Sequence, residues 1–216
     1  MHSLDQEVES STRLQFTIEG LCAAGFKGFV PFGALQGHAD ETWGRPGVYV
    51  VIREWPTDVQ LMEFNPTFEY KDHSPMLPLE ELQAAWDLPT PVLYIGKAGE
   101  LNRGVSLKDR LSLYRRYGAG TADNHAGGRA IWQVPNADKD LLVCWMATPN
   151  VYPVCIEEQL LRQFIAEFGM LPMANRRNES PCKHLTPCHW EPAGLSDADH
   201  CPNPPPAAPT VSTWPL

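Results

Sequence analysis

The residues that could handle phosphate gather in one stretch of the chain, residues 91–130. Seven lysines and arginines stand there against three acidic residues, a net charge of +4, whereas the whole chain of 216 residues carries −9. Such a local cationic zone concentrates attraction for an anion at one place. From charge alone, solvated helix faces are the commoner explanation, so the stretch needs support from other residues. The basic residues are Lys97, Arg103, Lys108, Arg110, Arg115, Arg116 and Arg129.

Two tyrosines occupy comparable places in two apolar runs. Tyr49 lies in the run 47–53, which follows a Pro-Gly turn signal, and Tyr94 lies in the run 91–97. Runs of this length, rich in β-branched residues and bounded by turn residues, predict buried strands. Their apolar setting by itself would make both tyrosines core residues, so a chemical role needs partners from elsewhere in the chain.

Three polar residues with suitable chemistry follow, each on or after a predicted helix. Arg110 lies in the amphipathic pattern 106–117, Glu157 lies near the start of the pattern 152–168, and Asn175 follows that helix. Arginine offers a permanent positive charge with planar donors that suit phosphate, and a carboxylate can hold a hard divalent cation. Considered one at a time, Glu157 could equally be a solvated helix glutamate, and Asn175 could equally be a turn residue at the end of a helix.

In this order, Gly-x-Tyr, Tyr-Ile-Gly, a helical arginine, a helical glutamate and an asparagine resemble the GIY-YIG nuclease family. The resemblance covers roughly residues 45–178, and Tyr-Ile-Gly-Lys-Ala-Gly after an apolar strand is its most specific part. Tyr114 stands four residues after Arg110, where bacterial excision-repair members have a tyrosine and homing and restriction members often have a histidine. The 44 residues between Tyr49 and Tyr94 imply an insertion, 54–90, where the family has a short hairpin.

The resemblance implies a metal-dependent endonuclease that hydrolyses phosphodiester bonds in DNA with one Mg²⁺ or Mn²⁺. Tyr49 would approach the attacking water. Because a phenol ordinarily has a pKa of about 10, it needs a nearby cation to act as a base, and Lys97 is a candidate for that cation. Arg110 would neutralise charge on the phosphoryl oxygens, while Tyr94 and Tyr114 would donate hydrogen bonds to phosphate or water.

The resemblance implies that Glu157 is the metal ligand, since the segment Ile156 to Leu161 matches the family's sequence pattern of an apolar residue, a glutamate and two later apolar residues. The neighbouring Glu158 stays open as the alternative ligand. Asn175 would either orient Glu157 or brace the site.

Further contacts to phosphate or nucleic acid are expected from the basic residues around this set. Residues 125–129 place a histidine and an arginine on either side of two glycines, and their backbone amides could face a phosphate. A plain hairpin turn leading into a strand at 129–134 is the alternative. The candidate contacts are Arg103, Arg115, Arg116, His125 and Arg129.

Hydrophobic periodicity and turn residues give the elements that must position these side chains. Paired strands with interleaved helices predict an α+β fold, a small central antiparallel sheet flanked by helices, as in the GIY-YIG domain. We expect an N-terminal extension 1–44 that packs on the core, a nuclease-like domain 45–178 and an irregular tail 179–216. The expected strands are 47–53, 91–97, 129–134 and 141–147, and the expected helices are 13–24, 79–86, 106–117 and 152–168.

The tail is irregular because the 36 residues from Pro181 onward hold nine of the 21 prolines. It also holds cysteines and histidines, which could bind Zn²⁺, but their spacings match no familiar zinc finger. Cys22, Cys144 and Cys155 stand in apolar contexts and are expected to be core thiols. The cysteines and histidines of the tail are Cys182, His184, Cys188, His189, His200 and Cys201.

Composition limits the classes of protein. A net charge of −9 excludes a bulk polycation that coats nucleic acid, and no run approaches the roughly 18 apolar residues of a membrane helix. A polar, acidic N-terminus and few cysteines make a cytoplasmic protein the default. The expected partner is DNA, with no membrane, and a partner protein could supply specificity. RNA or branched DNA stays open as substrate, and an inert nucleic-acid-binding or protein-interaction module that keeps the fold is the alternative function.

Overall fold

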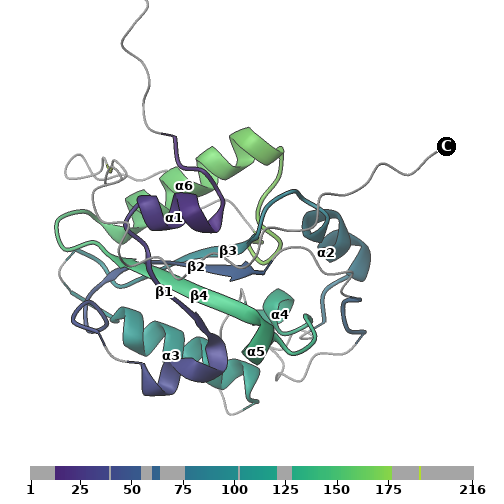
Figure 1. Ribbon diagram of the computed structural model, residues 1–216, viewed down its shortest axis with the longest axis horizontal. Helices are drawn as coiled ribbons and strands as arrows, with labels where there is room; N and C mark the ends of the chain where they lie inside the picture. Colours follow the sequence, from purple (N-terminus) through teal and green to yellow (C-terminus); the bar gives the residue numbers. More distant parts are fainter. Residues whose placement is uncertain are drawn as a thin grey trace, which may run out of the picture.

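The protein is an α+β fold built on a four-stranded antiparallel sheet in the order β1-β4-β2-β3. The computed structural model describes residues 13–38, 40–54, 60–63, 76–101, 103–120, 128–176 and 190. Helices lie on both sides of the sheet, α1 and α6 on one side and α3 on the other (Figure 1). The predicted class and the small antiparallel sheet are confirmed. The strands are β1 (Lys27–Pro31), β2 (Gly47–Arg53), β3 (Val92–Ala98) and β4 (Leu141–Ala147).

The central position of β2 in the sheet explains why its sequence is a continuous apolar run. It is hydrogen-bonded to β3 on one side and to β4 on the other, and all seven of its residues are buried. Because successive side chains of a strand point to opposite faces, Val48 and Val50 face α6 whereas Tyr49 faces α3. A strand covered on both faces carries no polar alternation, which is why its sequence is uniformly apolar.

The two longest helices begin and end where the sequence indicates. In α3 (Leu107–Gly118), the Ser106 hydroxyl accepts a hydrogen bond from the Asp109 N–H and the Asp109 carboxylate accepts one from the Ser106 N–H, a capping box. Helix α6 (Pro153–Phe168) has proline in its first turn and ends at Gly169, whose φ of 77° lies in the left-handed region. Both predicted helices are confirmed to within one residue or two.

Each face of the sheet has its own core. The α6-face core is aliphatic and phenylalanine-rich, and the α3-face core is rich in tyrosine and tryptophan. The α6-face core includes Phe16, Leu21, Val48, Val50, Ile95, Cys144, Ile156, Leu160 and Phe164. The α3-face core includes Phe32, Trp43, Tyr49, Tyr94, Leu111, Tyr114, Trp132 and Trp145.

Two local predictions are wrong. The strand expected at 129–134 is instead the helical turn α4 (Gly128–Ile131), because periodicity cannot separate a short buried strand from a short buried helix. Residues 27–31, where no strand was expected, form the edge strand β1. Gly28 has a φ of 99° and lies under the Trp145 ring, so its glycine marks a bulge in a strand and not a loop.

The remaining elements are short. The N-terminal helix α1 (Ile18–Ala23) is shorter than the expected 13–24, and the 3₁₀ helix η1 (Phe32–Gly37) follows β1. Helix α2 (Leu79–Trp86) matches its prediction, and α5 (Ala137–Asp140) precedes β4. The N-terminal region therefore contributes a strand to the sheet as well as packing on it.

Buried polar side chains fix the ends of the insertion. Gln133 accepts a hydrogen bond from the Leu77 N–H at 2.8 Å, and its carbonyl accepts one from the Met62 N–H at 2.8 Å. Arg53 donates to the carbonyl of Trp86 at 2.6 Å and lies over that indole, 4.1 Å from the ring centroid. These contacts hold 60–63 and α2 against the domain.

The cysteines differ from their prediction. Cys144 is a free, buried thiol, as expected, whereas Cys22 and Cys155 are disulfide-bonded. An apolar context suits a thiol and a half-cystine equally, so the sequence could not separate them. The proposed zinc cluster of the tail lies outside the described residues, and within them no helix has the length and apolarity to cross a membrane.

Candidate functional site

Three tyrosines from three elements meet on the α3 side of the sheet. The ring centroids of Tyr49 in β2 and Tyr94 in β3 are 5.8 Å apart. Tyr114 of α3 lies 6.3 Å from Tyr49 and 5.7 Å from Tyr94, edge-on to both. Tyr49 and Tyr114 are fully buried, and Tyr94 is 9% exposed. Residues from three separate parts of the chain thus form one cluster of phenols.

Gly96 makes room for this cluster. It is the direct cross-strand partner of Tyr49. A Cβ at this position would lie 2.7 Å from Tyr49 Cζ, 2.8 Å from Tyr49 Oη and 2.6 Å from Tyr94 Cε1. Any side chain would therefore displace both phenols, so the glycine of Tyr-Ile-Gly is required by packing.

Arg110 brings a positive charge to the cluster from one turn before Tyr114 on α3. Its half-buried guanidinium donates a hydrogen bond to Tyr49. Burial by itself lowers the pKa of this guanidinium, but the neighbouring Tyr49, Tyr94 and Glu157 raise it above its ordinary value. Arg110 is therefore a fixed cation beside the phenols.

Glu157 approaches the same groups from α6. It is only 4% exposed, and its charge acts on Tyr49, Tyr94 and Arg110. Its neighbour Ile156 packs into the α6-face core. Glu158, the alternative metal ligand, instead pairs with Arg162 on its own helix. The structure thus brings Glu157, and not Glu158, to the tyrosines.

The tyrosines are held in their neutral form. Burial raises the pKa of Tyr49, the charge and hydrogen bond of Arg110 lower it, and the result is a pKa above the ordinary value. Burial raises the pKa of Tyr94 and Tyr114 well above that value. The three phenols are therefore hydrogen-bond donors at neutral pH, and Tyr94 donates to Tyr49.

Lys97 does not take the role expected for it. It pairs in register with Val48, and strand alternation directs it to the sheet face of Ile95, opposite to Gly96. The cation that acts on the Tyr49 phenol is Arg110. One step along a strand changes the face, so closeness in sequence to Tyr94 did not bring Lys97 to the phenols.

Asn175 braces the strand that carries Tyr94. Its Oδ1 accepts a hydrogen bond from the Ile95 N–H at 2.9 Å and its Nδ2 donates to the Ile95 carbonyl at 2.8 Å. The Ala174 N–H donates to the Leu93 carbonyl at 2.9 Å. Because β3 is an edge strand, these bonds satisfy backbone groups that the sheet leaves open. Of its two expected roles, Asn175 has the bracing one in this structure.

The other basic candidates belong to several different parts of the chain. Arg103 is exposed and pairs with Glu100 at 2.8 Å, and Arg129 donates to the Met76 carbonyl at 3.2 Å. Arg116 is exposed on α3, whereas Arg115 lines a cavity at the end of that helix. His125 lies outside the described residues.

Sequence reasoning missed Trp132, which was placed in a predicted strand. Its ring lies 6.4 Å from that of Tyr114, edge-on, and 5.2 Å from that of Phe32. Gly118 was the available signal, because a Cβ there would lie 2.0 Å from Trp132 Cε2. A glycine inside the last turn of an amphipathic helix indicates close approach by another group.

Glu157 is the residue of this site that could hold one hard divalent cation. It supplies a carboxylate, the kind of oxygen ligand that Mg²⁺ and Mn²⁺ prefer, and its charge acts on Tyr49 and Tyr94. Within the described part of the chain, no group of three or more His, Cys, Asp or Glu side chains gathers to hold a metal. A cation here would therefore keep several waters as ligands.

Comparison with known proteins adds no relative: no family model, no curated protein and no solved structure matches the chain.

Proposed function

We propose that this protein is a metal-dependent endonuclease that hydrolyses phosphodiester bonds in DNA, with its chemistry at Tyr49, Tyr94, Arg110 and Glu157. The observation that carries the proposal is the convergence of these four groups, which come from β2, β3, α3 and α6. Phenols, a guanidinium and a buried carboxylate seldom share one cluster for packing alone, because each buried polar group costs free energy unless it is paired. The resemblance to GIY-YIG nucleases in the order of these residues supports the same proposal.

The roles follow from charge and hydrogen bonding. Arg110 binds a non-bridging phosphoryl oxygen with its planar donors and offsets the charge that develops in the transition state. In its phenolate form, Tyr49 accepts the proton of the attacking water at Oη, while Tyr94 donates a hydrogen bond to that oxygen. A divalent cation held by Glu157 supplies Lewis-acid assistance to the phosphoryl and leaving oxygens.

The raised pKa of Tyr49 has a consequence for this mechanism. The phenolate that can act as base is scarce at neutral pH, because burial outweighs the effect of Arg110. The positive charge of a bound divalent cation would lower that pKa. Cleavage is therefore expected to speed up as pH rises from neutral.

The test is nicking of supercoiled DNA by the purified protein, with Mg²⁺ or Mn²⁺ against chelator. Tyr49→Phe, Arg110→Ala and Glu157→Ala are each expected to slow cleavage by about 10²–10⁴-fold, with circular dichroism unchanged. Glu158→Ala, next to the metal ligand but paired with Arg162, is the matched control and should cleave normally. Full activity of Glu157→Ala, or in chelator, would contradict the proposal. A panel of single-stranded, duplex and branched DNA and RNA then identifies the substrate.

A catalytically inert nucleic-acid-binding module is the second candidate. The complete burial of Tyr49 and Tyr114 favours it, since a buried phenol reaches a substrate only if the site opens. The net charge of −9 also argues against tight binding without a partner protein. Salt-sensitive binding without cleavage across the same panel would establish this candidate.

A further inference from the structure

A cavity of about 350 Å³ opens beside the C-terminal turn of α3, next to the phenol cluster. Trp132 forms one of its walls and also contacts Tyr114, with ring centroids 6.4 Å apart. The volume lies at the lower end of the range of small-molecule sites, about 300–1,000 Å³. The cavity is therefore large enough for one small planar ligand. Such a ligand would lie against Trp132, which in turn contacts Tyr114.

The chain fixes two walls of this cavity. Trp132 is only 6% exposed and lies against Gly118, where any side chain would collide with the indole. Met62 comes from the insertion and is held because its N–H donates to the Gln133 carbonyl at 2.8 Å. The aromatic and apolar walls are thus formed before any ligand binds.

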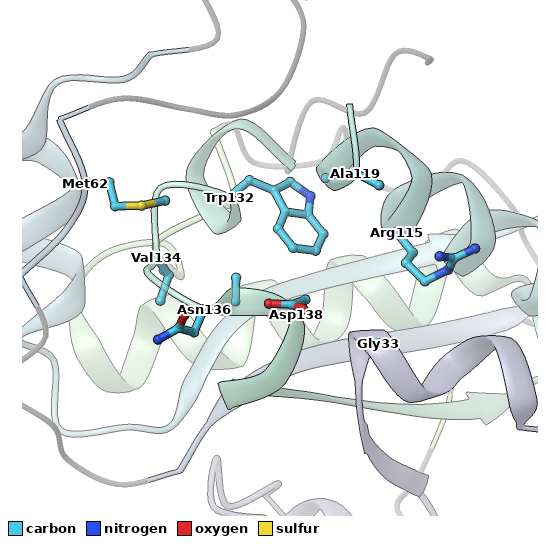
Figure 2. Close-up of a pocket in the computed structure, with 10 residues that line it drawn as sticks. Gly33, Met62, Arg115, Ala119, Trp132, Val134, Asn136 and Asp138 are labelled. Atoms are coloured by element: carbon cyan, nitrogen blue, oxygen red, sulfur yellow. The ribbon is translucent and has the colours of Figure 1, made fainter. Parts of the chain in front are cut away.

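Polar groups surround these apolar walls. Figure 2 shows the Asp138 carboxylate below the Trp132 indole, with Arg115 to one side and Asn136 to the other. Asn136 and Asp138 are exposed and Arg115 is half-buried. Neither Arg115 nor Asp138 takes part in the ion pairs found among the described residues. A cation and a carboxylate that are not paired with each other leave a donor and an acceptor for a ligand.

We propose that this cavity binds a guanine base. Guanine presents N1–H and N2–H₂ side by side as donors, which suit the Asp138 carboxylate, and O6 and N7 as acceptors, which suit the Arg115 guanidinium. Its planar ring would lie against Trp132 and Met62. Adenine places the N1 acceptor where guanine places a donor, so it would face Asp138 with a lone pair.

The base could belong to a free guanine nucleotide or to a nucleic-acid strand whose phosphate lies at Arg110. In the second case the cavity is a subsite of the enzyme proposed above, and that part of the inference rests on the proposed function. Extruding a base from a stack costs a few kcal/mol, least in single strands. A single strand is therefore the polymer on which the subsite would act first.

The first experiment measures binding of GMP, AMP and CMP to the full chain by calorimetry, with chelator present so that cleavage plays no part. GMP is expected to bind at least about 10-fold more tightly than AMP or CMP, the effect of one good bidentate pair. Asp138→Asn and Arg115→Ala should each weaken GMP binding about 10-fold or more. Asp140→Asn on the same short helix and Lys108→Ala, at an exposed position of α3, are controls and should bind GMP normally. Thermal melting checks that each variant is folded.

The second experiment separates the two sources of the base. Glu157→Ala protein is titrated with a single-stranded thymidine oligonucleotide and with one that carries a single internal guanine. Tighter binding of the guanine oligonucleotide, abolished by Asp138→Asn, identifies a strand subsite, whereas GMP binding without this preference identifies a free nucleotide. Equal binding of GMP and AMP, or no binding of GMP and no preference for the guanine oligonucleotide, overturns the proposal. Loss of cleavage alone would count against the proposed nuclease and not against guanine binding.

Discussion

The two faces of the central sheet are built from different side chains. On the α6 face, Phe16, Phe164 and Phe168 stack at centroid distances of 4.5–6.0 Å above aliphatic strand residues. On the α3 face, the buried rings other than Phe32 carry hydroxyl or indole N–H groups, and Tyr49 and Tyr94 meet a charged guanidinium. One sheet thus has a face that only packs and a face that packs around polar groups.

The comparison teaches that the buried phenols of the strands, and the guanidinium beside them, belong to the α3 side. In β2 the step from Val48 to Tyr49 changes the face and the chemistry together. Glu157 is the exception, because it belongs to α6 yet its charge acts on the tyrosines of the other face. A carboxylate buried at that place is costly unless cationic and hydrogen-bonding groups compensate it, which Arg110 does in part.

The largest expected effect comes from the removal of an aromatic ring from the α6 face. Phe164→Ala should lower the free energy of unfolding by about 3–5 kcal/mol, because a fully buried ring leaves a cavity. Urea unfolding measures this, and cleavage per folded molecule should stay near the wild-type value at a temperature where the variant is folded. Glu167→Ala is the control, because Glu167 is an exposed residue of the same helix whose ion pair is with the distant Arg13, and it should cost less than about 1 kcal/mol. A loss of cleavage as large as that of Tyr49→Phe in folded Phe164→Ala protein would contradict the division between the faces.

The second-largest expected effect comes from a substitution that displaces the tyrosines of the α3 face without removing a polar group. Gly96→Ala would place a methyl 2.6–2.8 Å from atoms of Tyr49 and Tyr94. We expect a loss of about 1–3 kcal/mol in the free energy of unfolding from overpacking, together with a fall in cleavage larger than that of Phe164→Ala. Gly37→Ala is the matched control, since nothing lies within 4 Å of its added Cβ. Wild-type cleavage by Gly96→Ala would show that the position of the phenols does not matter.

The smallest expected effect is the pH dependence of the free energy of unfolding, to which the buried phenols of the α3 face contribute. The pKa of Tyr49, Tyr94 and Tyr114 is raised by burial, so above pH 10 the unfolded chain loses phenol protons that the folded protein keeps. The free energy of unfolding should therefore fall with rising pH, by about 1.4 kcal/mol per pH unit for each phenol. Below that pH their contribution is fully present.

Urea unfolding across this pH range measures the slope. Burial also raises the pKa of Cys144 on the α6 face, so its contribution starts at lower pH and Cys144→Ala is the proper background. In that background, Tyr49→Phe should reduce the slope above pH 10. An unchanged slope would mean that the Tyr49 phenol is not held neutral by burial.

Local chemistry allowed much of the fold to be predicted. The runs 47–53 and 141–147 became strands at those residues, and Ser106 and Gly169 mark the ends of the two long helices. Segments whose local pattern suits two structures were mispredicted. Residues 128–131 formed a helical turn, where Gly128 allows close packing against Tyr117, and residues 27–31 formed a strand, where Gly28 accommodates Trp145.

For the site, the order of motifs singled out Tyr49, Tyr94, Arg110, Tyr114 and Glu157 before any geometry was known. The structure then decided which cation acts on Tyr49, replacing Lys97 by Arg110, and which backbone Asn175 holds. These facts depend on the face to which a side chain points and on which strand is left at an edge. Neither is encoded in spacing along the chain.

The sequence by itself determined the residue types, the positions of the main strands and the ends of the long helices, because these depend on contacts between residues close in the chain. Only the tertiary structure decided that α3 and α6, on opposite sides of the sheet, bring Arg110 and Glu157 to the same phenols. It also decided that Arg115, Trp132 and Asp138 share a cavity. Such placements result from the register and order of the strands, which many distant contacts set together.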